Sequence, residues 1–108
     1  MAAVLAESGA SGVGAIWDAM HTWRAGETPA EAAEALLPWL RELQLKDAAS
    51  ATDRRPMVPG TGTVPIKETL AAAKGFTGPI VLEHETKWYA DAAPFEESLA
   101  AFVNLMRQ

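Results

Sequence analysis

The sequence contains no cysteine in its 108 residues, so disulfide bridges, thiolate metal sites and cysteine nucleophiles are excluded together. It also lacks an excess of basic residues: nine Lys and Arg stand against 14 Asp and Glu, the formal net charge is −5, and Arg54-Arg55 is the only adjacent basic pair. Nucleic acid is therefore not an expected partner.

Long apolar runs are missing as well. None approaches the roughly 20 residues that cross a bilayer, and the first residues carry no basic segment of a signal peptide. What is present is an ordinary globular balance, 49% hydrophobic and 21% charged. We expect one domain over residues 1–108, located in the cytoplasm and not associated with a membrane.

Three segments have the character of buried strands. The apolar run 13–18 ends in an acid, the second half of 40–47 alternates with period two, and 79–83 is a third apolar run. Between the last two lies 48–64, whose Pro and Gly residues predict a long loop. Its Gly60-Thr61-Gly62 could offer backbone N–H groups to a phosphate, although most such sequences are only turns.

Helices are predicted between and after these strands. Thr28 opens one with a capping hydroxyl, a Pro and a Glu, and it should run to Trp39. Pro65 opens a second, with Gly75 as its C-terminal cap. Pro94 opens a third, with apolar residues on one face: Phe95, Leu99, Phe102, Val103 and Met106. Alternating strands and helices indicate an α/β fold with a parallel sheet.

Acidic residues end the predicted strands. Asp18, Asp47 and the pair Glu83 and Glu85 stand at these positions, and the carboxyl ends of parallel strands share one rim. The functional interpretation is that they converge in a site. The alternative is that each acid only caps a helix or orders a loop.

Alternation adds side chains to this rim. Gln44 and Lys46 share one face of their strand, as Glu83 and Glu85 share one face of theirs. Buried charges must be paired or bind a metal, so the alternative to a functional Glu83 is an ion pair with Lys46. His84 falls on the opposite face, where we expect packing.

Aromatic and histidine side chains accompany the candidate rim. His21 follows Asp18 by three residues, which suits a metal ligand or a substrate contact, although a lone His is more often neither. We expect Trp23 and Trp88 in loops beside the site, where an aromatic side chain could stack on a sugar.

Four segments carry a family resemblance in order along the chain. Trp-Asp-Ala-Met-His-Thr-Trp-Arg-Ala-Gly-Glu at 17–27 resembles the W-D-x-x-H-x-x-R-x-G-E stretch of xylose-isomerase-like sugar phosphate isomerases/epimerases. Leu-Lys-Asp-Ala at 45–48, Gly-Thr-Gly-Thr-Val-Pro at 60–65 and Leu-Glu-His-Glu-Thr-Lys-Trp at 82–88 resemble its next three signatures. The resemblance implies part of a (β/α)₈ TIM barrel, about three parallel βα units from its C-terminal half.

The resemblance also implies a divalent metal, Mn²⁺, Mg²⁺ or Zn²⁺, held at the rim by a Glu, an Asp, a His and a second Glu. Asp18 matches the Asp and Glu83 the last Glu, whereas Gln44 stands where the His is common and no residue matches the first Glu. An amide oxygen can bind Mg²⁺ or Mn²⁺, but it is a weaker and harder ligand than imidazole. We therefore expect weak Mn²⁺ binding through Asp18, Glu83 and Gln44.

The implied reaction interconverts a sugar or sugar phosphate with its isomer or epimer through an enediolate. Catalytic roles would fall to Glu83, His21 and Lys46, and substrate contacts to Arg24, Trp23, Trp88 and Glu85. Because the ligand set is incomplete, the alternative is a catalytically incompetent barrel fragment that acts through self-assembly, as a homo-oligomer, or with a partner chain that supplies the missing N-terminal part. A DNA-repair endonuclease on the same barrel ranks last, since it would need more histidines and a basic face.

Overall fold

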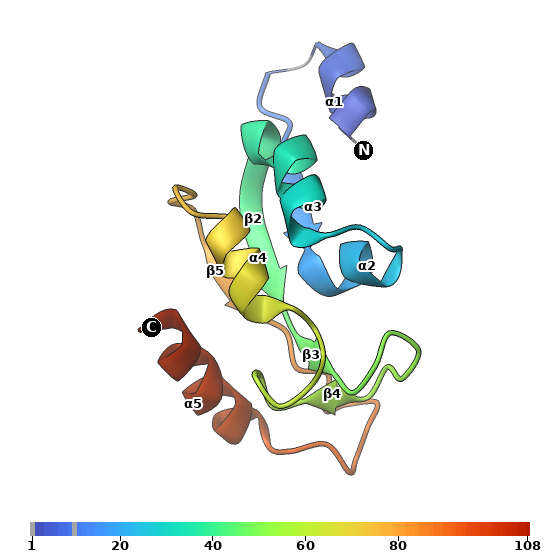
Figure 1. Ribbon diagram of the computed structural model, residues 1–108, viewed down its shortest axis with the longest axis vertical. Helices are drawn as coiled ribbons and strands as arrows, with labels where there is room; N and C mark the ends of the chain where they lie inside the picture. The colour runs from blue at the N-terminus through green and yellow to red at the C-terminus, as the bar shows by residue number, and fades with distance from the viewer. Residues whose placement is uncertain (1, 10) are drawn as a thin grey trace.

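A parallel sheet of three strands forms the centre of the computed structural model, which describes residues 2–9 and 11–108. The strands are β1 (Ala15–Asp18), β2 (Leu40–Leu45) and β5 (Ile80–Leu82), in the order β1-β2-β5 (Figure 1). The α/β class and the parallel sheet predicted from the sequence are confirmed. A closed (β/α)₈ barrel has eight parallel strands, and three parallel strands are consistent with part of one.

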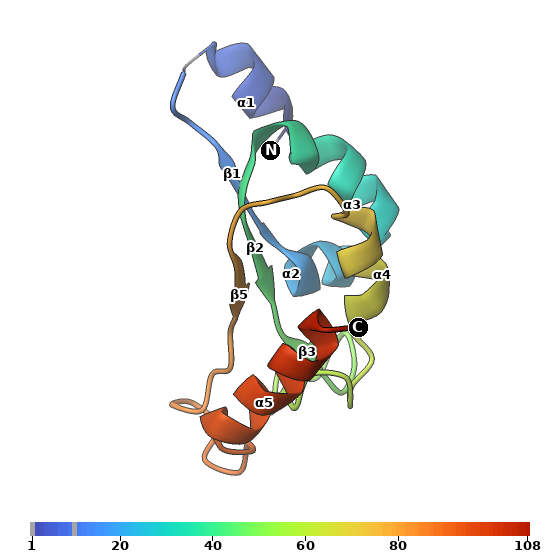
Figure 2. The same cartoon turned by 90° about the vertical axis from the view of Figure 1, so that its left-hand side faces the viewer.

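The two faces of the sheet differ in their cover. Helices α2 (Ala19–Arg24), α3 (Pro29–Leu36) and α4 (Ile66–Ala72) lie on one side of it (Figure 2). Beneath them Trp17 and Leu43 are fully buried. Such burial stabilises the fold by about 1.5–3 kcal/mol per large apolar side chain.

The opposite face carries the alternate residues of the same strands. Ile16 on this face is 53% exposed, and Asp18 lies opposite Gln44 in the register of β1 and β2. In a closed barrel this would be the interior face. In the described part of the chain this face is exposed at Ile16, and it carries the polar residues Asp18 and Gln44.

Local sequence signals place the helix ends. Thr28 and Glu31 form the predicted capping box, with Thr28 Oγ1 accepting from the Glu31 N–H at 3.1 Å. The predicted helix to Trp39 is shorter, because α3 ends at Leu36 and a 3₁₀ turn, η1 (Leu37–Trp39), follows. Pro38 lacks the N–H that a continuing α-helix needs.

The ends of the molecule carry the first and last helices. Helix α1 (Ala2–Ser8) has no buried residue, and α5 (Phe95–Met106) lies at the opposite end (Figure 1). Of the predicted apolar stripe on α5, Phe102 is buried, whereas the other four residues are exposed: Phe95, Leu99, Val103 and Met106. No described helix is long and apolar enough to cross a membrane.

Strand ends differ from the sequence prediction. The first strand begins at Ala15 instead of 13, and the third ends at Leu82, which puts Glu83 just beyond it. The second ends at Leu45. Asp47 belongs to a separate strand, β3 (Asp47–Ala48), which pairs antiparallel with β4 (Pro56–Met57). The predicted long loop therefore contains a small hairpin, which redirects the chain after Lys46.

The helix that directly follows the first strand was not predicted from the sequence. Helix α2 follows β1 without an intervening loop, and Asp18 is its N-cap, accepting from the His21 N–H at 3.4 Å. The expectation that Trp23 lies in a loop is wrong, because it belongs to α2 and packs against the core. With six residues, α2 is too short to show a helical period in the sequence.

Candidate functional site

A lysine ammonium stands where three carboxylates meet at the carboxyl edge of the sheet. Lys46 Nζ lies 2.7 Å from Glu83 Oε2, 3.2 Å from Asp18 Oδ2 and 3.6 Å from Glu85 Oε1. Asp18 ends β1, Lys46 follows β2, and the two glutamates follow β5. The predicted convergence of these acids is confirmed, and so is the alternative interpretation, an ion pair between Lys46 and Glu83.

Burial makes this arrangement more than a surface ion pair. The Lys46 side chain is 10% exposed and that of Asp18 20%. Desolvation alone would lower the pKa of Lys46, but hydrogen bonds and Coulomb attraction from Glu83 and Asp18 outweigh it and raise that pKa above its usual value. The ammonium is therefore charged at neutral pH, and three carboxylates oppose one positive charge.

Asp47 does not join the cluster through an ion pair, and the expectation that it converges there is corrected. Its carboxylate is buried and accepts backbone N–H groups from Gly60 at 2.8 Å, Gly62 at 2.9 Å and Val64 at 3.2 Å, as well as from Ala48 at 2.9 Å. The anion held by the Gly-Thr-Gly backbone is thus the protein's own carboxylate. For Asp47 the loop-ordering alternative is correct.

The close approach of the loop backbone to the Asp47 carboxylate requires a glycine at position 62. A Cβ at that position would collide with the Ala48 carbonyl oxygen and the Asp47 carboxylate. Gly60 has φ +94°, a conformation that favours glycine. The loop is therefore built around Asp47, and it holds the backbone that follows Lys46.

A cavity of about 190 Å³ opens beside the Lys46 cluster. Cavities that bind small molecules are commonly larger, so this one suits a small ligand or part of one. Most of its lining residues follow the sheet strands or belong to the hairpin loop: Met20, His21, Arg24, Lys46, Asp47, Arg54, Pro56, Glu83, Glu85, Trp88 and Tyr89. Six of the predicted site residues are among them: His21, Arg24, Lys46, Glu83, Glu85 and Trp88.

The remaining predicted residues lie differently. Asp18 contacts Lys46 without lining the cavity, and Trp23 packs against the core. Gln44 donates its amide N–H to Glu42 Oε2 at 3.2 Å. His84 contacts the Ala93 carbonyl oxygen at 2.7 Å and so packs away from the site, as expected.

Sequence reasoning missed Arg54, Tyr89 and Met20 as lining residues. Arg54 was noted only as half of a basic pair. The available signal was its place in the loop that follows the second strand, because loops on that side form the sites of parallel barrels. Met20 was hidden because α2 was not predicted.

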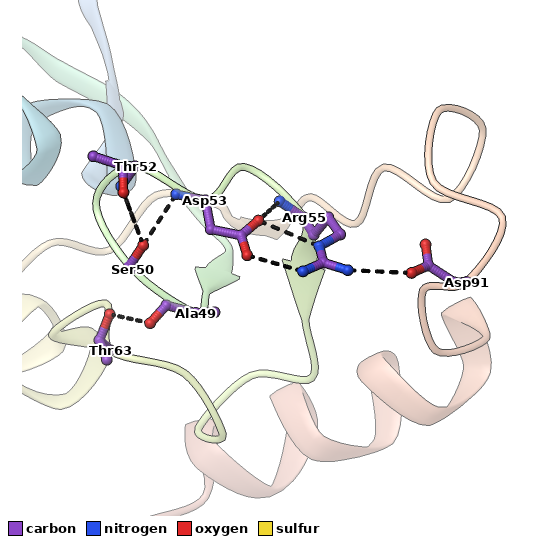
Figure 3. A network of polar contacts seen from close by, with 7 residues as sticks. All are labelled: Ala49, Ser50, Thr52, Asp53, Arg55, Thr63 and Asp91. Atoms are coloured by element: carbon purple, nitrogen blue, oxygen red, sulfur yellow. Dashed lines mark hydrogen bonds and ion pairs between the residues drawn. The ribbon is translucent and has the colours of Figure 1, made fainter.

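Polar contacts order the loop that carries Arg54. The Asp53 backbone N–H donates to Ser50 Oγ at 3.0 Å, and the Asp53 carboxylate forms an ion pair with Arg55, whose guanidinium reaches Asp91 at 3.4 Å (Figure 3). The pKa of Asp53 is lowered by its hydrogen bonds with Arg55. Arg24 Nε donates to the Ala51 carbonyl oxygen at 2.8 Å, which fixes this loop to α2. These contacts connect the loop that carries Arg54 to α2 and to the segment around Asp91.

The side chains present do not fit a divalent metal as they are arranged. Asp18 and Glu83 are directed at an ammonium, and the Gln44 amide is engaged with Glu42. Across residues 2–9 and 11–108, no three His, Cys, Asp or Glu side chains are grouped so that they could hold a metal ion. Binding of Mn²⁺, Mg²⁺ or Zn²⁺ stays a prediction from the sequence.

Parallel βα units, with a polar cluster and a cavity at the carboxyl edge of the sheet, are consistent with part of a (β/α)₈ barrel. The chain belongs to the xylose isomerase-like TIM barrel family, whose model matches residues 1–105. The resemblance stated from the four segments is thereby confirmed, and at the level of the family the function is of the sugar isomerase/epimerase type. Comparisons with curated proteins and with solved structures give no match.

Proposed function

We propose that this chain carries an isomerase/epimerase-type site for a small sugar, in which Glu83 moves a proton and Lys46 stabilises the negative charge that develops on substrate oxygen. The observation that carries the proposal is the short contact of 2.7 Å between these two side chains at the edge of the cavity. A base and a cation in one place are what proton abstraction next to a carbonyl needs.

The chemistry follows from these positions. Glu83 removes the proton from the carbon beside the carbonyl, and the electron pair moves onto the carbonyl oxygen to give an enediolate. The Lys46 ammonium donates a hydrogen bond to that oxygen. Return of the proton to the former carbonyl carbon, with transfer of the hydroxyl proton from the neighbouring oxygen to the former carbonyl oxygen, gives an isomer. Delivery of a solvent proton to the other face of the original carbon, while Glu83 releases its proton to solvent, gives an epimer.

Other residues of the cavity would bind the substrate. Asp18 holds Lys46 in place, and His21 Nε2 lies 3.5 Å from the Asp18 carboxylate. Trp88 is 71% exposed beside the cavity, where its ring can cover a sugar face. Arg24 and Glu85 also line the cavity, where they would be hydrogen-bonding partners for anionic and hydroxyl groups respectively.

The test is exchange of substrate hydrogen with solvent. Aldoses, ketoses and their phosphates are incubated with the protein in D₂O, and NMR detects deuterium at the carbon beside the carbonyl. We expect exchange with at least one sugar, because an enediolate takes up a solvent proton when it is quenched. No exchange with any member of a broad panel would contradict the proposed function.

We propose a second function, self-association, because one observation favours it independently. Four apolar residues of α5 are exposed on one helix face: Phe95, Leu99, Val103 and Met106. Exposed contiguous apolar surface marks an interaction site. A second copy of this chain is the partner we propose, since symmetric dimers are the commonest soluble oligomers.

Light scattering at micromolar concentration tests this association. We expect at least a dimer mass for the wild type and a shift to the monomer mass in Leu99→Glu, which puts a charge in the middle of the stripe. Val4→Glu is the control, because Val4 is 69% exposed but belongs to α1. A monomer mass for the wild type would refute association through α5.

A further inference from the structure

Lys46 occupies the point on which three carboxylates converge. Its Nζ lies within 3.6 Å of oxygens of Asp18, Glu83 and Glu85, which come from the ends of two different strands. Carboxylate oxygens are also the ligands that hard divalent cations take, but with Lys46 between them the described acids are not grouped so that they could hold a metal ion. An ammonium is itself a compact point charge with three donors, so it can satisfy three such oxygens.

We propose that the Lys46 ammonium and a divalent cation compete for the same carboxylate oxygens, so that Lys46 excludes a metal from this site and supplies the positive charge in its place. The two cations would be within a few ångströms of each other, where their repulsion is strong even after screening. The inference rests on the proposed function only where it assigns the Lys46 charge to the stabilisation of substrate oxygen. The position of that charge among the carboxylates rests on the contacts alone.

The backbone around Lys46 favours this fixed position. Leu45 before it is buried in the core, and Asp47 after it is held by the backbone N–H groups of the Gly60-to-Val64 segment. The Lys46 side chain is 10% exposed. If its ammonium left the carboxylates, it would be a buried charge without a partner, unless the side chain turned further out into the cavity. A metal would have to displace the ammonium against the attraction of three carboxylates.

Calorimetric titration of Mn²⁺ at neutral pH into the complete chain tests the competition. We expect Lys46→Met to bind Mn²⁺ more tightly than the wild type by about tenfold or more, because it removes a unit charge from the midst of the ligands. Adding Asp18→Asn or Glu83→Gln to Lys46→Met should abolish the gain. Equal or weaker binding in Lys46→Met would overturn the proposal.

Two further variants test whether Mn²⁺ affinity depends on the position of the lysine or only on the net charge of the protein. Lys67→Met makes the same substitution at an exposed residue of α4, and its Mn²⁺ affinity should equal that of the wild type. Lys46→Arg keeps the charge and should bind Mn²⁺ no better than the wild type. A gain in Lys67→Met equal to that in Lys46→Met would reduce the effect to overall charge and refute the competition.

A measurement on the wild type covers the case in which Lys46→Met fails to fold. Mn²⁺ broadens NMR signals close to it, and we expect the amide signals of Asp18 and Glu83 to broaden no earlier than those of exposed acids such as Glu68. Selective broadening at Asp18 and Glu83 would show a metal among the carboxylates despite Lys46, and would overturn the proposal. If the wild type showed no exchange of sugar hydrogen with solvent, while the Mn²⁺ affinities and the NMR broadening were as expected, only the proposed function would be refuted.

Discussion

Glu83→Gln is expected to lower the rate of sugar hydrogen exchange by about 10²- to 10⁴-fold, the range that general acid–base catalysis contributes. The amide has the size of the carboxylate, and its oxygen can still accept the hydrogen bond from Lys46 Nζ that Glu83 accepts at 2.7 Å. It cannot accept the substrate proton. The turnover rate should therefore fall while the apparent affinity for the sugar changes little, and kinetics by NMR would separate the two.

Glu68→Gln is the matched control for this loss. It makes the same substitution on an exposed residue in the first turn of α4, outside the cavity. Its exchange rate should equal that of the wild type. If Glu83→Gln kept the wild-type rate as well, Glu83 would be only the ion-pair partner of Lys46, and the proton-transfer role would be wrong.

Local signals allowed much of the fold to be predicted. The capping box at Thr28 acts within a few residues of itself and lies where the sequence indicates. The predicted cap at Gly75 is wrong by two residues, because Ala73 is the C-cap of α4, and Gly75 lies in the turn that follows, with φ +97°. The end of β2 could not be placed in this way. Asp47 pairs with Met57 across the hairpin, and such a pairing depends on residues distant in the sequence.

Topology explains which part of the site was predictable. Asp18 and Glu83 were expected together because parallel strands bring their carboxyl ends to one edge. Asp47 was the error, although alternation already argued against it: neighbouring residues in extended backbone point to opposite sides, so Lys46 and Asp47 could not both face the cluster. That Lys46 takes the centre, and that Arg54 and Tyr89 complete the cavity, depends on loop conformations without a periodic signal.

Asp47→Ala is expected to destabilise the protein by about 3–5 kcal/mol, because it leaves several backbone N–H groups without an acceptor. The bonds from Ala48 and Val64 are buried, and those from Gly60 and Gly62 are partly buried. Small domains have only about 5–15 kcal/mol of stability in total. Thermal unfolding followed by circular dichroism should show a midpoint lowered by more than about 10 °C.

Two comparisons make this expectation specific to the buried carboxylate. Asp53→Ala removes a partly exposed acid from the same hairpin loop, where the ion pair with the exposed Arg55 is screened by solvent, and its unfolding midpoint should stay close to that of the wild type. Asp47→Asn keeps one acceptor oxygen but turns the other into a donor facing N–H groups, so its midpoint should lie between those of Asp47→Ala and the wild type. A wild-type midpoint in Asp47→Ala would mean that the Gly60-to-Val64 segment finds other acceptors, and that Asp47 does not hold the loop that positions Lys46.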